Sequence, residues 1–220
     1  MTHMQCGKQW NQGLAIGVFV GLFTLSSFAF CQQQNAHPTI SDKPLSAEQL
    51  EIYAAVLRGW MNDGKHTLHL ADLTIPLDKE DTKDCGKFPP ADINSVTVHR
   101  FRQQDIASLG SSMIRLVDPE VQSREIQRND PGKAIQNGTS VDEAVENGYA
   151  HGLVTLSEIR FDQSHTHAIV WYGFRCGGLC GNGGTVLMEK KDGKWREEKS
   201  CSIWMSKRQM TPGLPFAEGS

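Results

Sequence analysis

The sequence predicts an α+β fold in which an N-terminal helix and several short helices pack on an antiparallel meander sheet. Two observations carry this prediction. Helix signals precede residue 150, whereas strand signals joined by short turns dominate residues 153 to 205. Consecutive strands on short turns form antiparallel sheets, and segregated helices and strands are typical of α+β rather than alternating folds.

Composition fits one globular domain, which we place at residues 46 to 210. The 220 residues are 39% hydrophobic and 21% charged, with a formal net charge of -3. These values are ordinary for a globular protein. Lysine and arginine form no basic stripe, so the sequence predicts no nucleic-acid partner.

The N-terminal 29 residues carry the pattern of a signal peptide. Lys8 precedes an uninterrupted apolar run, residues 14 to 30, and small residues flank Phe28 near its end. We therefore expect cleavage after Ala29 and export to the periplasm or the extracellular space. A retained membrane anchor and a lipid anchor on Cys31 are the alternatives. The sequence predicts contact with a membrane only through this segment, if it is not cleaved.

Residues 30 to 45 are polar, contain two prolines and show no apolar period, so we expect a flexible linker. A helix is expected to begin after Ser46, because Ser46 and Gln49 have the spacing of a capping box. Apolar residues follow at helical intervals as far as Met61.

The middle of the chain alternates strand and helix signals. We expect strands at residues 65–75, 95–101 and 111–117, and a charged loop at 76–90 that carries Cys85. Asp118 and Pro119 signal a helix start, and Ser140 begins a second capping box. Chain breaks are expected at residues 129–132 and 136–139.

The C-terminal third is the predicted meander. We expect strands at residues 153–161, 167–174, 185–191 and 195–205, an irregular glycine-rich loop at 175–184 and a loose tail at 211–220. Asp192 and Gly193 are typical of a two-residue hairpin turn. Strand 167–174 is apolar on both faces and is therefore expected at the centre of the sheet. We expect Trp195 and Cys201 to share one register in the last strand.

Four motifs in this third resemble a family of uncharacterised exported bacterial proteins. They are an LSEIRF strand, an AIVWY strand, a CGGLCGNG loop and an MEKKDGKW hairpin, at residues 156–161, 168–172, 176–183 and 188–195. No activity is associated with this resemblance, so it implies no catalytic residue and no cofactor.

Four cysteines are disulfide candidates, because an exported chain meets an oxidising compartment. Cys176 and Cys180 are close enough to pair within the glycine-rich loop, and Cys85 with Cys201 is the natural second pair. Cys31 is then left over. Redox activity, metal binding and free thiols are the alternatives for Cys176 and Cys180.

Two histidines add an alternative. His165 and His167 have strand spacing and could join Cys176 and Cys180 in a zinc site. On the structural interpretation, His165 is a turn residue and His167 is a partly buried strand residue. His66, His69, His99 and His151 are too scattered to be assembled from the sequence. A phosphate loop is excluded at residues 177–184, because a strand rather than a helix follows the glycines.

The sequence therefore predicts an exported domain that is a binding or structural module with a disulfide-shaped loop. It identifies no partner and no metal or cofactor, and leaves open whether the protein is an enzyme. The alternatives are a small secreted hydrolase or thiol-redox enzyme, using His165, His167 or the cysteine pair, and a zinc-binding module.

Overall fold

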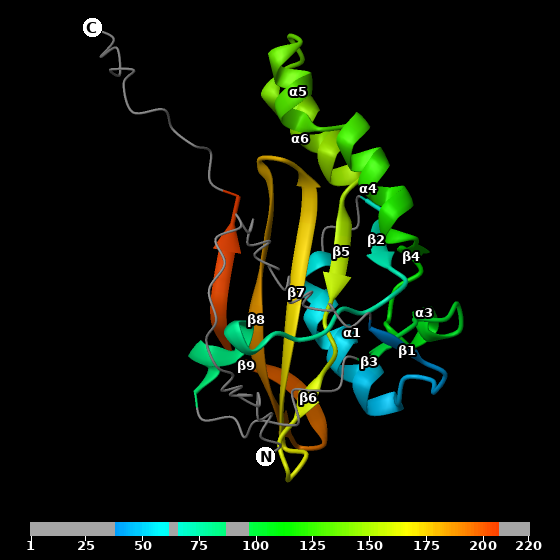
Figure 1. The fold of residues 1–220 in the computed structure, drawn as a ribbon, viewed down its shortest axis with the longest axis vertical. Coiled ribbons are helices and arrows are strands. Elements are labelled where there is room, and N and C mark those ends of the chain that lie inside the picture. The colour runs from blue at the N-terminus through cyan, green and yellow to red at the C-terminus, as the bar shows by residue number, and fades with distance from the viewer. Residues whose placement is uncertain (1–37, 62–65, 87–96, 207–220) are drawn as a thin grey trace, which may run out of the picture. The chain divides into compact units, whose positions relative to one another are not determined.

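The computed structural model describes residues 38–61, 66–86 and 97–206 (Figure 1). These residues all belong to the second of two compact units, Ala36–Ser220. The predicted signal peptide at 1–29 and loose tail at 211–220 lie outside the described residues. Among the described helices, none has both the length and the apolar character needed to cross a membrane.

The described residues form a seven-stranded sheet in the order β4-β2-β5-β7-β8-β9, with β6 paired to β7. The strands are β2 (Leu68–Ala71), β4 (Ile114–Val117), β5 (Leu153–Leu156), β6 (Arg160–Phe161), β7 (His167–Gly177), β8 (Cys180–Lys191) and β9 (Lys194–Met205). The α+β class is confirmed, but the antiparallel prediction holds only for part of the sheet. β2 pairs in parallel with β4 and β5. Parallel neighbours need long crossovers, and strand signals alone do not reveal which strands become neighbours.

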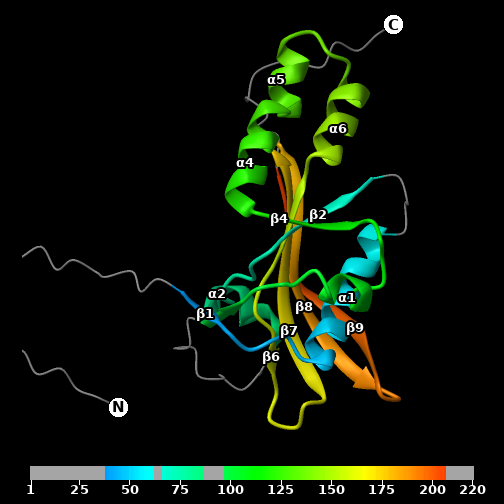
Figure 2. The same cartoon turned by 90° about the vertical axis from the view of Figure 1, so that its right-hand side faces the viewer.

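Helices cover both faces of the sheet (Figure 2). They are α1 (Ala47–Met61), α2 (Lys79–Thr82), the 3-10 helix η1 (Lys83–Cys85), α3 (Asp105–Ser108), α4 (Pro119–Arg128), α5 (Pro131–Gln136) and α6 (Val141–Ala150). α1 buries Tyr53 and Leu57 in the main core with Val170 of β7. On the opposite face, Leu77 and Cys85 pack on β7 and β8. This second layer explains why β7 is apolar on both faces.

The helix starts follow the sequence signals. At α1 the Ser46 hydroxyl accepts the Gln49 amide at 3.2 Å, and the Gln49 side chain accepts the Ser46 amide at 2.9 Å. Asp118 caps α4 and Ser140 caps α6 through their side chains. These contacts satisfy backbone N–H groups that lack a partner within the helix.

One prediction in the loops is wrong, and one short helix was not expected. Part of the expected linker forms β1 (Thr39–Ser41), which pairs in parallel with β3 (Thr97–His99), so a distant strand supplies the hydrogen bonds that hold it. The expected breaks are confirmed, because α4 ends at Arg128 and α5 ends at Gln136, but the sequence reading did not foresee α5 itself, which Asp130 caps and Pro131 begins. Asp followed by Pro is a helix start as well as a turn signal.

The glycine-rich segment 175–184 is regular, contrary to expectation. β7 continues to Gly177, β8 begins at Cys180, and the two pair almost throughout. A Cβ atom at Gly184 would overlap the carbonyl oxygen of Ser202 on β9, so this glycine permits close strand approach.

The Asp192-Gly193 turn is confirmed, with φ of 52° and 73° at its two residues. The pairing of β8 with β9 then shifts twice. As a result Trp195 lies in the core beneath α1, whereas Cys201 contacts the cluster on the opposite face, so the single register expected for them is wrong.

Candidate functional site

The described residues contain two disulfides, which are the pairs suggested by the sequence. Cys85 is joined to Cys201, with 4.8 Å between their Cα atoms, and ties η1 to the edge strand β9. Cys176 is joined to Cys180, with 5.0 Å between their Cα atoms, and closes the turn between β7 and β8. The first disulfide spans 116 residues and the second spans four.

The turn closed by Cys176 and Cys180 is held by Asp130, the N-cap of α5. Its carboxylate accepts the backbone N–H of Gly178 at 2.7 Å and that of Lys133 at 3.2 Å. Partial burial raises the pKa of Asp130, but these backbone hydrogen bonds outweigh it and lower the pKa below its ordinary value. The disulfide loop is therefore anchored to the helical part of the fold.

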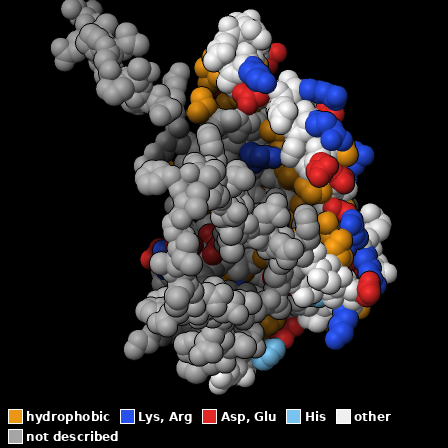
Figure 3. Space-filling model, in the orientation of Figure 1, with side chains coloured by type: hydrophobic (Ala, Val, Ile, Leu, Met, Phe, Trp, Pro, Cys, Tyr) orange, Lys and Arg blue, Asp and Glu red, His pale blue; other side chains and the backbone are white. Residues whose placement is uncertain are grey.

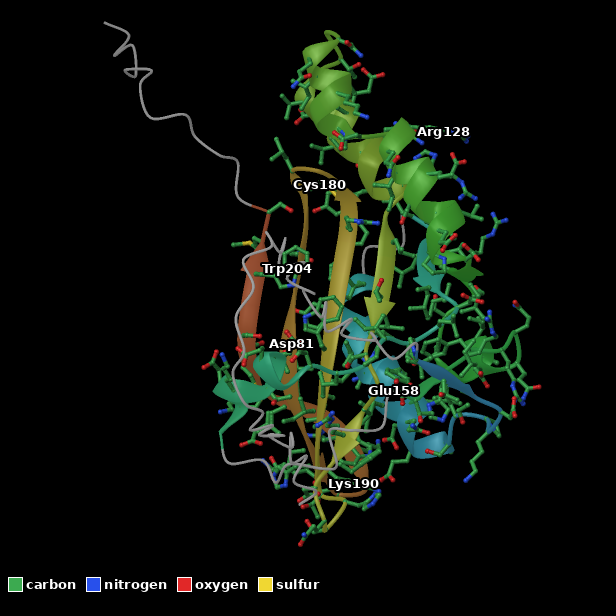
Figure 4. All side chains as sticks on the ribbon, viewed as in Figure 1. Asp81, Arg128, Glu158, Cys180, Lys190 and Trp204 are labelled. Carbon is green, nitrogen blue, oxygen red and sulfur yellow. A yellow bond between two sulfur atoms is a disulfide. The ribbon has the colours of Figure 1, made fainter. Side chains whose placement is uncertain are left out.

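His165 and His167 lie at the other end of the long hairpin. His165 Nδ1 is 3.6 Å from Glu48, and His167 Nδ1 is 3.4 Å from Asp162. β7 separates His167 from Cys176 by nine residues, about 30 Å in an extended strand. Figure 4 shows Cys180 and Lys190 at these two opposite ends of β8.

The zinc site built from both histidines and both cysteines is therefore wrong, because one strand holds the two pairs apart and the cysteines are bonded to each other. Within the described part of the chain, no group of three or more His, Cys, Asp or Glu side chains is placed to hold a metal ion.

A more promising site lies where α1, α6 and β7 meet. A pocket of about 160 Å³ is lined there by Gly59, Trp60, His66, Thr67, Leu68, His69, Tyr149, Gly152 and Phe174. We call it the aromatic pocket. The ring centroids of Trp60 and Phe174 are 5.0 Å apart, and Tyr149 stacks on Phe174 at 5.2 Å. Three elements that are distant in the sequence thus contribute one ring each.

Local features fix two walls of the aromatic pocket. A Cβ atom on Gly152 would overlap the Phe174 ring, so the glycine creates the space in which that ring lies. His66 Nε2 lies 2.9 Å from a carboxylate oxygen of Glu146 on α6, which orients the His66 imidazole. The pocket therefore combines a rigid aromatic wall with an oriented histidine.

His69 also lines a second pocket of about 530 Å³, which we call the polar pocket. Its lining residues are His69, Arg115, Leu116, Val117, Asp118, Val121, Gln122, Glu125, Ala150 and His151. The buried Gln122 donates to the carbonyl oxygen of His151 at 2.6 Å, and its amide nitrogen is 3.5 Å from His69 Nδ1.

Burial lowers the pKa of His69 below its ordinary value. A hydrogen bond with the Gly152 backbone raises the pKa of His69, whereas the positive charge of the nearby Arg115 lowers it further. The imidazole of His69 is therefore neutral at neutral pH and can both donate and accept a hydrogen bond.

The sequence missed this assembly. His66, His69 and His151 were considered scattered, but parallel pairing places His69 opposite Leu153, two residues after His151. No local pattern reports such a pairing. Trp60 and Phe174 read from the sequence as core residues, because a pocket wall and a core wall have the same apolar spacing.

Comparisons with known proteins give no counterpart: no family model, no curated protein and no solved structure matches this chain.

Proposed function

We propose that this chain is an exported binding module that holds a small ring-shaped organic molecule in the aromatic pocket. The observation that carries the proposal is the convergence of Trp60, Tyr149 and Phe174 with two histidines on one pocket. Apolar walls with a few oriented polar groups are typical of small-molecule sites. The volume of about 160 Å³ suits a ligand with one or two rings, since an engineered cavity of about 150 Å³ binds benzene.

The chemistry of the walls supports a planar ligand. Aromatic rings prefer offset-stacked or edge-to-face contacts with other rings, and each such contact contributes about 1 kcal/mol beyond its buried area. Tyr149 is 44% exposed, so a ligand would bury ring surface that is now in contact with water. His66 and His69 would then supply the polar contacts that orient the ligand.

Export is supported by the two disulfides, since stable disulfides are common in oxidising compartments and rare in the cytosol. It also rests on the predicted signal peptide. Intact-mass and peptide mass spectrometry of the exported protein tests both points. We expect a chain that begins after Ala29 and is four hydrogens lighter than its fully reduced form.

The alternative enzymatic hypotheses place activity elsewhere, at His165, His167 or the Cys176–Cys180 pair. None of these residues lines the aromatic pocket. A Cys176→Ser variant therefore separates the ideas, because our proposal expects it to retain ligand binding while a thiol-redox enzyme would lose activity.

The direct test is binding of phenol and indole to the mature protein, measured by ligand-observed NMR and calorimetry. We expect millimolar or tighter binding by the wild type and a loss of about fivefold in affinity for Tyr149→Ala, the equivalent of one aromatic contact. Trp204→Ala is the matched control, because Trp204 is a similarly exposed aromatic residue, at 40%, that lines neither pocket. Absence of binding by the wild type, or equal loss in both variants, contradicts the proposal.

A further inference from the structure

β9 is the last strand of the sheet, and β8 is its one neighbour among the strands that the structure describes (Figure 1). An edge strand offers unpaired backbone N–H and C=O groups to any strand that comes alongside it. Natural proteins protect such edges with charged side chains or with elements that cover them. The two halves of β9 differ in this protection.

The first half of β9 is protected. It carries four charged residues in succession, at positions 196–199. η1 is attached close to the end of this half, through the Cys85–Cys201 disulfide and a hydrogen bond of 3.5 Å from the Lys199 ammonium to the carbonyl oxygen of Asp84. A strand that paired along the whole edge would therefore have to accommodate these charges.

The last residues of β9 are uncharged and exposed. Ile203 and Met205 are 67% and 70% exposed, the highest values among the large hydrophobic side chains that the structure describes, and Trp204 is 40% exposed. Their partners on β8 explain part of this exposure, because Ile203 lies opposite Gly184 and Trp204 lies opposite Gly183, which offer no side chain. An apolar, unprotected edge of this kind is typical of a strand that pairs with another chain.

The backbone groups of Ile203 and Met205 point away from β8. The N–H of Ser206 donates to the carbonyl oxygen of Gly181 at 2.9 Å, and the carbonyl oxygen of Ser202 faces Gly184 of β8. In an antiparallel pair, alternate residues direct both backbone groups to the same neighbour. Residues 202, 204 and 206 therefore bond to β8, whereas Ile203 and Met205 present their N–H and C=O groups to the open edge.

We propose that two copies of this chain pair through the ends of their β9 strands, antiparallel about a twofold axis at Trp204, so that the two sheets become one. Ile203 of each copy lies opposite Met205 of the other copy. Each of these pairs exchanges both backbone hydrogen bonds, so every outward group at positions 203 and 205 has a partner. The apolar side chains at these positions then pack on one face of the joined sheet, and the two Trp204 rings meet on the other face.

The distribution of charge favours a second copy over an unrelated strand. Residues 202–206, which overlap in this register, carry no charge, and the charged residues 196–199 lie outside the overlap. A twofold axis matches each apolar residue with an apolar residue, because the same patch on both copies forms the contact. Figure 3 shows that Lys and Arg side chains are frequent along the opposite edge of the molecule, where α4 lies, so that edge is less suited to contact between copies.

Such a contact is small, so we expect a weak dimer. Interfaces below about 1,200 Å² are typical of weak or transient association. Sedimentation of the mature protein from about 10 µM to about 1 mM tests this, and we expect a monomer–dimer equilibrium with a dissociation constant on the order of 100 µM.

Two lysine variants test the position of the contact. Ile203→Lys places a charge of the same sign on both copies at the paired edge, and we expect it to raise the dissociation constant at least about tenfold. Val141→Lys is the matched control, because Val141 is a similarly exposed β-branched residue, at 59%, that lies on α6, and the substitution adds the same charge. It is expected to leave the dissociation constant unchanged.

Amide hydrogen exchange, measured by NMR, distinguishes strand pairing from other contacts. The N–H groups of Ile203 and Met205 should exchange about fourfold more slowly at the highest protein concentration than at the lowest, because most chains are then paired. The N–H of Trp204 already bonds to β8 and is the internal control, so its exchange should change less.

Several outcomes overturn the inference. They are a protein that stays monomeric at the highest concentration, a dimer that Ile203→Lys leaves unchanged, and a dimer weakened equally by Val141→Lys. A dimer in which the amides of Ile203 and Met205 exchange at the monomer rate also overturns it, because the copies then meet elsewhere. The exchange measurement needs no variant, so it decides the question even if Ile203→Lys fails to fold. The proposed ligand site is independent of the result, since no residue of β9 lines the aromatic pocket.

Discussion

The imidazole Nδ1 of His99 lies 2.9 Å from a carboxylate oxygen of Glu158. The other carboxylate oxygen accepts the backbone N–H of His99 at 2.8 Å and the hydroxyl of Thr74. Both side chains are mostly buried, at 17% and 16% exposure. One carboxylate thus joins β3 to the segments that follow β2 and β5, at a point where the regular sheet has ended.

We expect Glu158→Ala to lower the free energy of unfolding by about 2 to 4 kcal/mol, because it leaves buried donors without an acceptor. Glu158→Gln keeps one acceptor oxygen, so we expect it to lower the free energy of unfolding by less than Glu158→Ala does. Urea denaturation measures both. The exposed Glu120→Ala is the control and should cost less than about 1 kcal/mol. A cost for Glu158→Ala as small as that of the control would show that the network contributes little.

The two disulfides should contribute unequally, because they close loops of very different length. Chain-entropy estimates give about 5 kcal/mol for the 116-residue span of Cys85–Cys201 and about 2 kcal/mol for the four-residue span of Cys176–Cys180. Replacing both cysteines of each pair by alanine, followed by thermal and urea denaturation, tests this order. Equal losses would mean that the short disulfide acts through native contacts such as the Asp130 anchor.

Asp162 makes the turn before β7 sensitive to acid. Burial raises the pKa of Asp162, but hydrogen bonds from Ser164, His167 and Thr166 outweigh it and hold the pKa well below its ordinary value. The folded state therefore binds its proton more weakly than the unfolded state. This contribution to stability is complete at neutral pH and is lost as the pH falls below about 4.

Asp162→Asn should accordingly cost about 1 to 2 kcal/mol at pH 7, since hydrogen bonds to a charged acceptor become hydrogen bonds to a neutral one. The difference from wild type should shrink as the pH approaches 2. Urea denaturation at several pH values measures it. A difference that is constant with pH would show that the lost stability comes from packing and not from the charge.

Local signals predicted much of the fold, because capping and turn residues act on their neighbours. Ser46, Asp118 and Ser140 begin helices where the sequence placed them, and Asp192-Gly193 turns the hairpin. The parallel pairing of β2 could not be foreseen in this way, because it depends on contacts between segments far apart in the chain.

The same limit applies to the candidate site. The disulfide pairs could be predicted from the number and spacing of the cysteines. The aromatic pocket could not, because it forms only where the end of α6 lies beside the first residues of β5 and β2. His69 and Arg115 are 46 positions apart and meet only through sheet register. The histidine spacing of residues 165 and 167 suggested chemistry but carried no information about the length of the following strand.

Two glycines of the aromatic pocket should respond in opposite ways to alanine. A methyl group on Gly152 would overlap the Phe174 ring, so the ring must move out of its position. We expect Gly152→Ala to lower stability by about 1 to 3 kcal/mol, which is typical of overpacking, and to weaken ring-ligand binding.

Gly59 has no heavy atom within 4 Å of the position its Cβ would occupy, and it lies in the last turn of α1. Gly59→Ala should therefore raise stability by about 0.5 to 1 kcal/mol, because alanine is the better helix former. Thermal denaturation combined with phenol titration compares the two variants. Both glycines line the same pocket. Changes in stability of opposite sign would therefore show that the position of Phe174, rather than the composition of the pocket alone, controls stability and binding. If Gly152→Ala leaves the stability unchanged, Phe174 must have an alternative position of similar energy. That result would refute the rigid aromatic wall.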